Sequence, residues 1–192
     1  MKARVLFATG YEADAVIARV AKEQNAPLTV VDLLRRAGVE CLMVSADDQD
    51  TVTGARGMEV TMDEKLSEID DQCDLVVLPG GIPGVPNLKT NSKVQAMVKA
   101  QNDRGGYVAA ICAGPTALGA FGVLADKNAT CYPGCEDQLM AKRHSTEPVV
   151  VDGNVITSRG VGTAIEFALK LVEILIDRHT ADDLAEKIVY KR

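Results

Sequence analysis

Short apolar runs alternate with amphipathic segments along most of this chain, and the alternation restricts its fold more than any other feature. Four of the runs are rich in Val, Leu and Ile and lack alternating polarity, as expected of strands covered on both faces. They are Arg4 to Ala8, Glu40 to Ser45, Asp74 to Leu78 and Tyr107 to Ile111. We predict that these four strands are parallel.

Helical patterns separate and follow these strands. We predict helices over Leu28 to Arg36, Asp63 to Ile69, Ser92 to Asp103, Glu136 to Arg143 and about Ala181 to Val189. Thr163 to Glu166 has the form of a capping box and predicts a further helix to about Ile176. Val149 to Val151 and Asn154 to Thr157, joined by Asp152-Gly153, predict a late hairpin. The order indicates a doubly wound, mostly parallel α/β sheet, whose ligand crevice lies at the carboxyl ends of the strands.

Length and charge restrict the class of protein. The 192 residues are predicted to form a single domain. A formal net charge of -6, with Lys and Arg scattered, argues against a nucleic-acid partner. No apolar stretch approaches the ~18 residues of a membrane span, so we expect a cytoplasmic protein with no membrane partner. The five cysteines lack paired spacing, and we expect them to be reduced.

Cys112 stands where the strand ending at Ile111 gives way to a predicted helix. Small residues surround it, and Pro115 suits a first helical turn. A thiol at a helix N-terminus is expected to have a lowered pKa and to be a reactive nucleophile. The alternative interpretation is a small apolar side chain buried at a strand end.

Two more turns follow predicted strands. Gly80 and Gly81 come shortly after Leu78 and let backbone N–H groups point into the crevice, where we expect an oxyanion hole facing Cys112; the alternative is a plain tight turn. Arg159, in the turn before Thr163, offers a cation for a carboxylate or phosphate; a structural ion pair is the alternative.

The remaining cysteines and the two histidines give weaker evidence for a functional role. Cys131 and Cys135 have half of a metal-site spacing but no further ligands at suitable positions, so we expect no metal; a role in resolving an oxidised Cys112 stays open. Cys41 and Cys73 are interpreted as strand-end packing residues. His144, after the predicted helix to Arg143, and His179, between the last helices, give little support for a Cys-His-Asp triad.

Taken together, these segments resemble the ThiJ/PfpI family, the DJ-one-like deglycase superfamily, in family order over nearly the whole chain. The matching motifs are Val77 to Gly81, Ala109 to Thr116, Asp32 to Gly38, and Thr157 to Gly160 with Gly162-Thr163. The resemblance implies a flavodoxin-like three-layer sandwich, usually a homodimer, with Cys112 as the reactive cysteine and two glycines as oxyanion donors. Family activities include cofactor-free glyoxalase, protein deglycase, redox-regulated chaperone and, more distantly, protease or amidase.

The chain departs from the family pattern at two places. Family members have an acidic residue near the thiol, but counting from Gly10 puts Ala15 there, and counting back from Asp32 puts Ala26 there. The chain has an unusual extra segment at about 14–27. Glu12, Asp14 and Glu23 are the candidate acids, and Glu12 is preferred. The alternative interpretation is that all three are solvated charges on a helix or an inserted loop.

At the second departure, Tyr132 stands where some relatives have a histidine. It offers a hydrogen-bond donor but is a poor base near neutral pH.

These observations leave three hypotheses for the function. The first is a cofactor-free enzyme that acts on small reactive carbonyls or their adducts. The second is a non-enzymatic redox sensor or stress chaperone that works through oxidation of Cys112. The third is an intracellular amidase or peptidase. The predicted catalytic set is Cys112, Glu12, Gly80, Gly81 and Ala113, with Tyr132 and Arg159 binding the substrate and no cofactor required.

Overall fold

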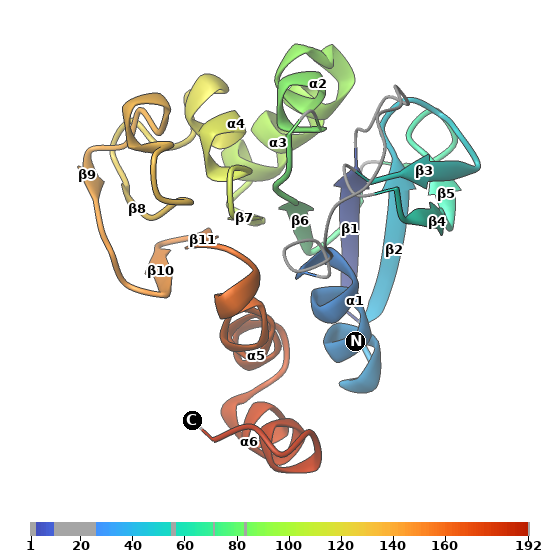
Figure 1. Ribbon diagram of the computed structural model, residues 1–192, viewed down its shortest axis with the longest axis vertical. Helices are drawn as coiled ribbons and strands as arrows, with labels where there is room; N and C mark the ends of the chain where they lie inside the picture. The colour runs from blue at the N-terminus through green and yellow to red at the C-terminus, as the bar shows by residue number, and fades with distance from the viewer. Residues whose placement is uncertain (1–2, 10–25, 55–56, 71, 83, 192) are drawn as a thin grey trace.

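A seven-stranded sheet forms the centre of the protein, in the order β10-β11-β7-β6-β1-β2-β5 (Figure 1). The computed structural model describes residues 3–9, 26–54, 57–70, 72–82 and 84–191. All neighbouring strands are parallel except β10 and β11. The strands are β1 (Arg4–Thr9), β2 (Glu40–Ser45), β5 (Glu64–Lys65), β6 (Leu75–Leu78), β7 (Tyr107–Ile111), β10 (Val149–Asp152) and β11 (Val155–Ser158).

The strand order identifies the topology. When the two-residue edge strand β5 is left out, the parallel strands β1, β2, β6, β7 and β11, numbered along the chain, lie in the spatial order 2-1-3-4-5, which is the flavodoxin-like doubly wound order. The predicted fold class is therefore confirmed. The winding reverses between β1 and β6, so the ligand crevice of such a sheet lies outside the carboxyl ends of these strands.

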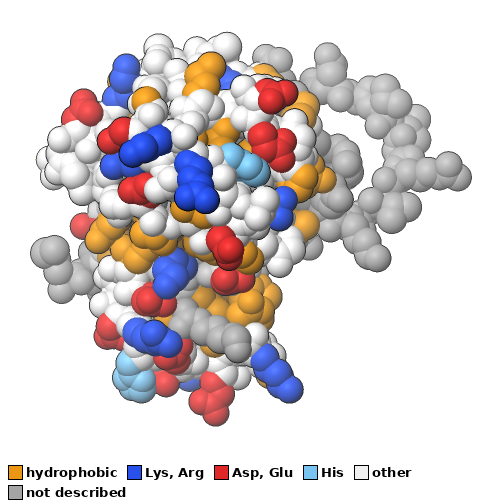
Figure 2. Space-filling model, turned by 90° about the vertical axis from the view of Figure 1, so that its left-hand side faces the viewer, with side chains coloured by type: hydrophobic (Ala, Val, Ile, Leu, Met, Phe, Trp, Pro, Cys, Tyr) orange, Lys and Arg blue, Asp and Glu red, His pale blue; other side chains and the backbone are white. Residues whose placement is uncertain are grey.

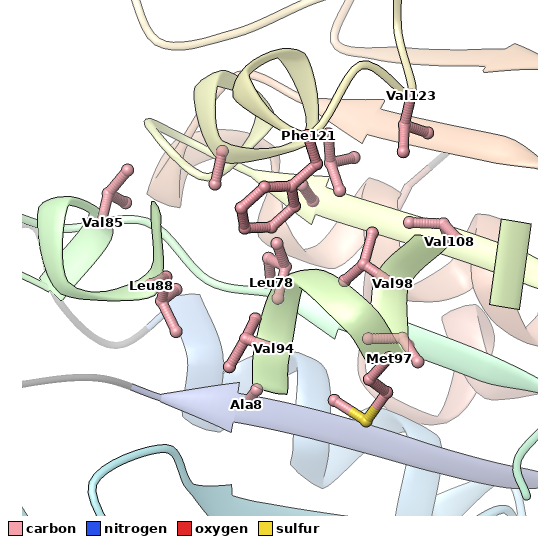
Figure 3. Packing of buried hydrophobic residues seen from close by; sticks show 14 of the residues in the cluster. Ala8, Leu78, Val85, Leu88, Val94, Met97, Val98, Val108, Phe121 and Val123 are labelled. Carbon is pink, nitrogen blue, oxygen red and sulfur yellow. The ribbon is translucent and has the colours of Figure 1, made fainter. Parts of the chain in front are cut away.

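Helices cover both faces of the sheet and enclose one apolar core on each side (Figure 1). On one face, Leu78 of β6 lies among Val94, Val98 and Phe121 (Figure 3); we call this the α3-side cluster. The cluster on the other face, which includes Phe167 and Leu34, is the α5-side cluster. The helices are α1 (Ala26–Arg36), α2 (Gly84–Thr90), α3 (Ser92–Asp103), α4 (Pro115–Ala120), α5 (Ala164–Leu175) and α6 (Arg178–Lys187).

Smaller elements complete the fold. They are the antiparallel pair β3 (Thr51–Thr53) and β4 (Glu59–Thr61), the parallel pair β8 (Asn128–Ala129) and β9 (Arg143–His144), and the 3-10 turns η1 (Glu136–Gln138) and η2 (Val161–Thr163). None of the described helices is long and apolar enough to cross a lipid bilayer. On the face in Figure 2, Lys and Arg are interspersed with Asp and Glu and form no basic stripe.

The prediction of a helix over Asp63 to Ile69 was wrong. This stretch contains the edge strand β5, in which Glu64 and Lys65 pair with β2. The Asp63 carboxylate accepts hydrogen bonds from the backbone N–H of Met43 at 2.7 Å and from the Arg35 guanidinium at 2.5 Å. These long-range contacts stabilise the extended backbone more than the weak helical pattern stabilises a helix.

The predicted helix over Glu136 to Arg143 was also wrong. Only the 3-10 turn η1 forms, and Arg143 belongs to β9. Met140 has φ of 50° and stops any continuation, because a left-handed residue cannot extend a right-handed helix. Leu139 instead turns into the core, where it is 1% exposed.

The long helix after Thr163 exists, but the predicted capping box does not. The Thr163 hydroxyl makes no capping bond to α5; it accepts from the Gly160 backbone N–H at 3.1 Å and lies 2.7 Å from the Ser158 hydroxyl. The last helix begins at Arg178, three residues before the predicted start, because the Asp177 side chain caps it by accepting from the backbone N–H of Thr180.

Candidate active site

Cys112 occupies a strained turn at the end of β7. Its φ of 64° lies in the left-handed region, which a side chain other than glycine rarely adopts. Its backbone N–H donates to the carbonyl of Ser158 at 3.0 Å, and its carbonyl accepts from the N–H of Tyr132 at 2.8 Å. Pro115 then opens α4, as predicted. Such strain persists only where the surrounding structure imposes it, and it is typical of functional sites.

Gly80 follows β6 and lies directly against the half-buried Cys112 side chain. A Cβ atom built at this position would lie 2.4 Å from the Cβ and 2.9 Å from the Sγ of Cys112, and 2.9 Å from the backbone nitrogen of Ala113. Only glycine fits there without displacing the thiol. The next residue, Gly81, has φ of 104°, and its carbonyl accepts from the N–H of Val85 as the chain enters α2.

Gly114 makes a second close contact, and the steric need for glycine at this position was not predicted from the sequence. A Cβ atom here would lie 2.6 Å from the carbonyl oxygen of Leu78 and 2.8 Å from that of Pro79. Gly114 therefore lets the turn after Cys112 pack onto the end of β6. The position of this glycine, two residues after the candidate nucleophile, could have indicated a close backbone approach.

A tight turn carries Tyr132 beside the thiol. The N–H of Cys135 donates to the carbonyl of Tyr132 at 3.0 Å, and Gly134 has φ of 91°; with Pro133 at the second position these features define a type II turn. The Tyr132 ring is partly exposed and packs beside Gly160, where an added Cβ would lie 3.4 Å from the ring.

Arg159 leaves the sheet next to Ser158, the residue that anchors Cys112. One guanidinium nitrogen donates to the carbonyl of Thr146 at 3.3 Å, while the buried Nε has no hydrogen-bond partner. Within the described part of the chain, no carboxylate forms a salt bridge with Arg159. The structural ion pair considered above is therefore not seen there.

The predicted acid cannot be located. Glu12, Asp14 and Glu23, together with Ala15, lie outside the described residues. The same holds for most of the extra segment at 14–27, of which residues 26 and 27 open α1.

Burial raises the pKa of three of the other thiols. Cys41 and Cys131 are buried, and desolvation raises the pKa of each thiol to about 12. Burial also raises the pKa of Cys135, which is partly exposed. These three thiols are protonated and poorly nucleophilic near neutral pH.

Neither histidine occupies the site. His144 is exposed on β9, and His179 is exposed in the first turn of α6 rather than between the last two helices. Among the residues with described positions, no three or more His, Cys, Asp or Glu side chains gather as they would around a metal ion.

Comparison with known proteins identifies the family. The model of the DJ-1/PfpI family matches residues 16–174. The chain belongs to the DJ-1/PfpI family. It is 38% identical to the Parkinson disease protein 7 homolog of Danio rerio, over 95% of this chain and 98% of that protein. It is 36% identical to the glutathione-independent glyoxalase DJR-1.2 of Caenorhabditis elegans, over 75% of this chain and 77% of that protein.

A solved structure shows the same fold. The structure of oxidized DJ-1 from Toxoplasma gondii superposes with a TM-score of 0.89 at 31% identity and covers 99% of this chain and 100% of that one. The family resemblance predicted from the motifs around Gly80 and Cys112 is confirmed.

Proposed function

We propose that this protein is a cofactor-free enzyme that acts on small reactive carbonyls or their adducts, as a glyoxalase or deglycase does, with Cys112 as the nucleophile. The name of the Caenorhabditis elegans relative supports the reaction class. The observation that carries the proposal is the left-handed Cys112, with Gly80 so close to its Cβ and Sγ that no other side chain fits.

The proposed reaction begins with addition. The Cys112 thiolate attacks the aldehyde carbon, a C–S bond forms, and the carbonyl π electrons move onto oxygen. Backbone N–H groups at Gly80, Gly81 and Ala113 stabilise this oxyanion until it accepts a proton. With a 2-oxoaldehyde, a base moves the former aldehyde proton to the adjacent carbon, the proton of the new hydroxyl passes to the former ketone oxygen, and a thioester forms. Water then cleaves the thioester, which releases a 2-hydroxy acid and regenerates the thiol.

Two further residues are proposed to bind the substrate, and one to move the protons. The Tyr132 hydroxyl donates a hydrogen bond to a substrate oxygen. Arg159, whose Nε is without a partner, attracts a negatively charged substrate group. Glu12 is the proposed acid and base. The active unit is proposed to be a homodimer, which light scattering during gel filtration tests directly.

Turnover of methylglyoxal by the purified protein, without glutathione, tests the proposal. We expect Cys112→Ala to abolish turnover and Cys73→Ala, which alters a partly buried cysteine before β6, to retain it. Equal turnover by Cys112→Ala and the wild type contradicts the proposal. Limiting iodoacetamide at pH 7 is expected to label Cys112 first, and faster labelling of Cys41 or Cys131 would refute its assignment as the nucleophile.

A redox sensor or stress chaperone is the second candidate, favoured by the oxidized state of the Toxoplasma gondii relative. In this case peroxide converts Cys112 to a sulfinic acid without loss of the fold, because nearby N–H groups stabilise the added oxygens. Negligible carbonyl turnover together with this product favours the sensor. An amidase or peptidase receives no support from the exposed His144 and His179.

A further inference from the structure

Cys131 and Cys135 flank the turn that carries Tyr132, and the proposed reaction uses neither. In a type II turn the Cα atoms of the first and fourth residues, here Tyr132 and Cys135, lie within about 7 Å. Cys131 is the next residue before that turn. A disulfide requires Cα atoms at a similar separation, about 4.4–6.8 Å. The backbone therefore places Cys131 and Cys135 on either side of one tight turn, and no other charge acts on Cys131 as strongly as that of Cys135.

The packing of the cysteine side chains indicates which two of them pair. Cys131 belongs to the α3-side cluster, and Cys135 packs against the same cluster. Cys112 instead packs against the α5-side cluster, across the sheet. We therefore choose Cys135 as the partner of Cys131. The charge of Cys112 also acts on Cys131, but less than that of Cys135, and Cys112 is joined to this segment by the hydrogen bond from the Tyr132 N–H.

We propose that Cys131 and Cys135 are a redox-active dithiol that closes a disulfide across the Tyr132 turn and does not include Cys112. The oxidant is a low-molecular-weight disulfide such as glutathione disulfide. The partly exposed Cys135 loses its proton to water and attacks one glutathione sulfur, which releases one glutathione thiolate. Cys131 then loses its proton and attacks the Cys135 sulfur, which releases the second glutathione and forms the S–S bond.

The charges around the pair set its pH dependence. Burial raises the pKa of both thiols. The negative charges of Cys135, Glu136 and Cys112 raise the pKa of Cys131 further, while the positive charge of Arg159 lowers it. At Cys135, the negative charge of Glu136 raises the pKa and the positive charge of Lys89 lowers it. Because only the thiolate attacks, bridge formation is slow at neutral pH and accelerates by about ten-fold per pH unit up to the thiol pKa.

The bridge acts on the candidate site through the Tyr132 turn. The Tyr132 N–H holds the Cys112 carbonyl, and the Tyr132 ring packs beside Gly160. A bond between the residues on either side of Tyr132, Pro133 and Gly134 fixes this turn. On the basis of the proposed function, we expect bridge formation to change carbonyl turnover reversibly.

Tryptic peptides distinguish the possible bridges. Residues 128–142 form one peptide that holds both Cys131 and Cys135, whereas Cys112 lies in the peptide of residues 105–127. The protein and its Cys112→Ser variant are treated with glutathione disulfide at mildly alkaline pH, alkylated in acid and digested. We expect peptide 128–142 to lose two hydrogens and to resist alkylation in both proteins. A cross-link between the two peptides, or a fully alkylated 128–142 peptide in the Cys112→Ser protein, overturns the proposal.

Turnover measurements provide a second test. Wild type is compared with Cys135→Ser and with the matched control Cys73→Ser, before and after glutathione disulfide and again after dithiothreitol. Glutathione disulfide also forms a mixed disulfide with the reactive Cys112, which lowers turnover in all three proteins. We expect an additional reversible change of at least two-fold in wild type and Cys73→Ser that is absent from Cys135→Ser. A bridge that leaves turnover unchanged overturns the link to Tyr132. Absence of turnover in every sample refutes the proposed function, while the peptide masses still decide the bridge.

Discussion

Replacing Gly80 by alanine is the most direct test of the site geometry. The added Cβ lies 2.4 Å from the Cys112 Cβ, whereas carbon atoms in ordinary contact are about 3.5–4.0 Å apart. The two segments must therefore separate by about 1.1–1.6 Å. Gly80 does not have a positive φ, so the cost of the substitution comes from this contact.

The Cys112 backbone resists that movement. Ser158 and Tyr132 hold it from two sides by hydrogen bonds of 3.0 and 2.8 Å. Overpacking of this kind destabilises a folded protein by about 1–3 kcal/mol, which leaves a domain of ordinary stability folded. A misplacement of about 1 Å in an active site costs about a hundred-fold in rate. We expect Gly80→Ala to reduce turnover by that order and to change the rate of Cys112 alkylation.

Gly162→Ala is the matched control. A Cβ at Gly162 meets nothing within 4 Å and its φ is not positive, so the same substitution there is expected to be neutral. Urea unfolding, iodoacetamide labelling and methylglyoxal turnover are measured on both variants. If Gly80→Ala behaves like Gly162→Ala in all three, the proposed geometry is wrong. If it loses only stability, the contact is structural and does not position the nucleophile.

Three other changes test separate parts of the molecule. Glu12→Gln is expected to lower turnover at least ten-fold, since general acid–base help is worth about 10²–10⁴, whereas Asp14→Asn and Glu23→Gln have little effect; loss with Glu23→Gln alone contradicts this choice of acid. Asn91→Ala removes the α3 cap, whose side chain accepts from two backbone N–H groups, and is expected to cost about 1 kcal/mol in urea unfolding. Hydrogen bonds from Asn128 lower the pKa of Asp152 below 3.8, so its stabilisation is present above that pH and is lost as the pH falls through the lower folded-state pKa. Asp152→Asn is therefore expected to be less stable than wild type at neutral pH, with the difference shrinking in acid; a constant difference contradicts this assignment.

The central strands were predictable from the sequence because a strand buried on both faces is apolar along its whole length. Strands covered on both faces are continuous apolar runs, and Tyr107 to Ile111 coincides with β7. Edge elements were not predictable in this way. Glu64 and Lys65 are polar, and they form β5 only because β2 lies beside them. Long-range pairing of this kind leaves no periodic signal in the segment itself.

Part of the candidate site was also predictable from the sequence. The turns at Gly80 and Cys112 were expected to meet because adjacent parallel strands end at the same edge, and the structure places them in contact. The need for glycine at position 114 and the anchoring of Cys112 by Ser158 were missed. Both depend on backbone atoms of β6 and β11, whose approach no local pattern encodes.

The conformation of Cys112 links the proposed chemistry to the choice of redox partner. A left-handed residue other than glycine costs about 1–3 kcal/mol, and two backbone hydrogen bonds worth about 0.5–1.5 kcal/mol each offset that cost here. Moving the Cys112 backbone toward Cys131 would require the turn to move away from Gly80 and both hydrogen bonds to lengthen. The constraints that hold the Cys112 backbone for attack on a substrate therefore also oppose its movement toward the α3-side cluster, which favours Cys135 as the thiol that pairs with Cys131.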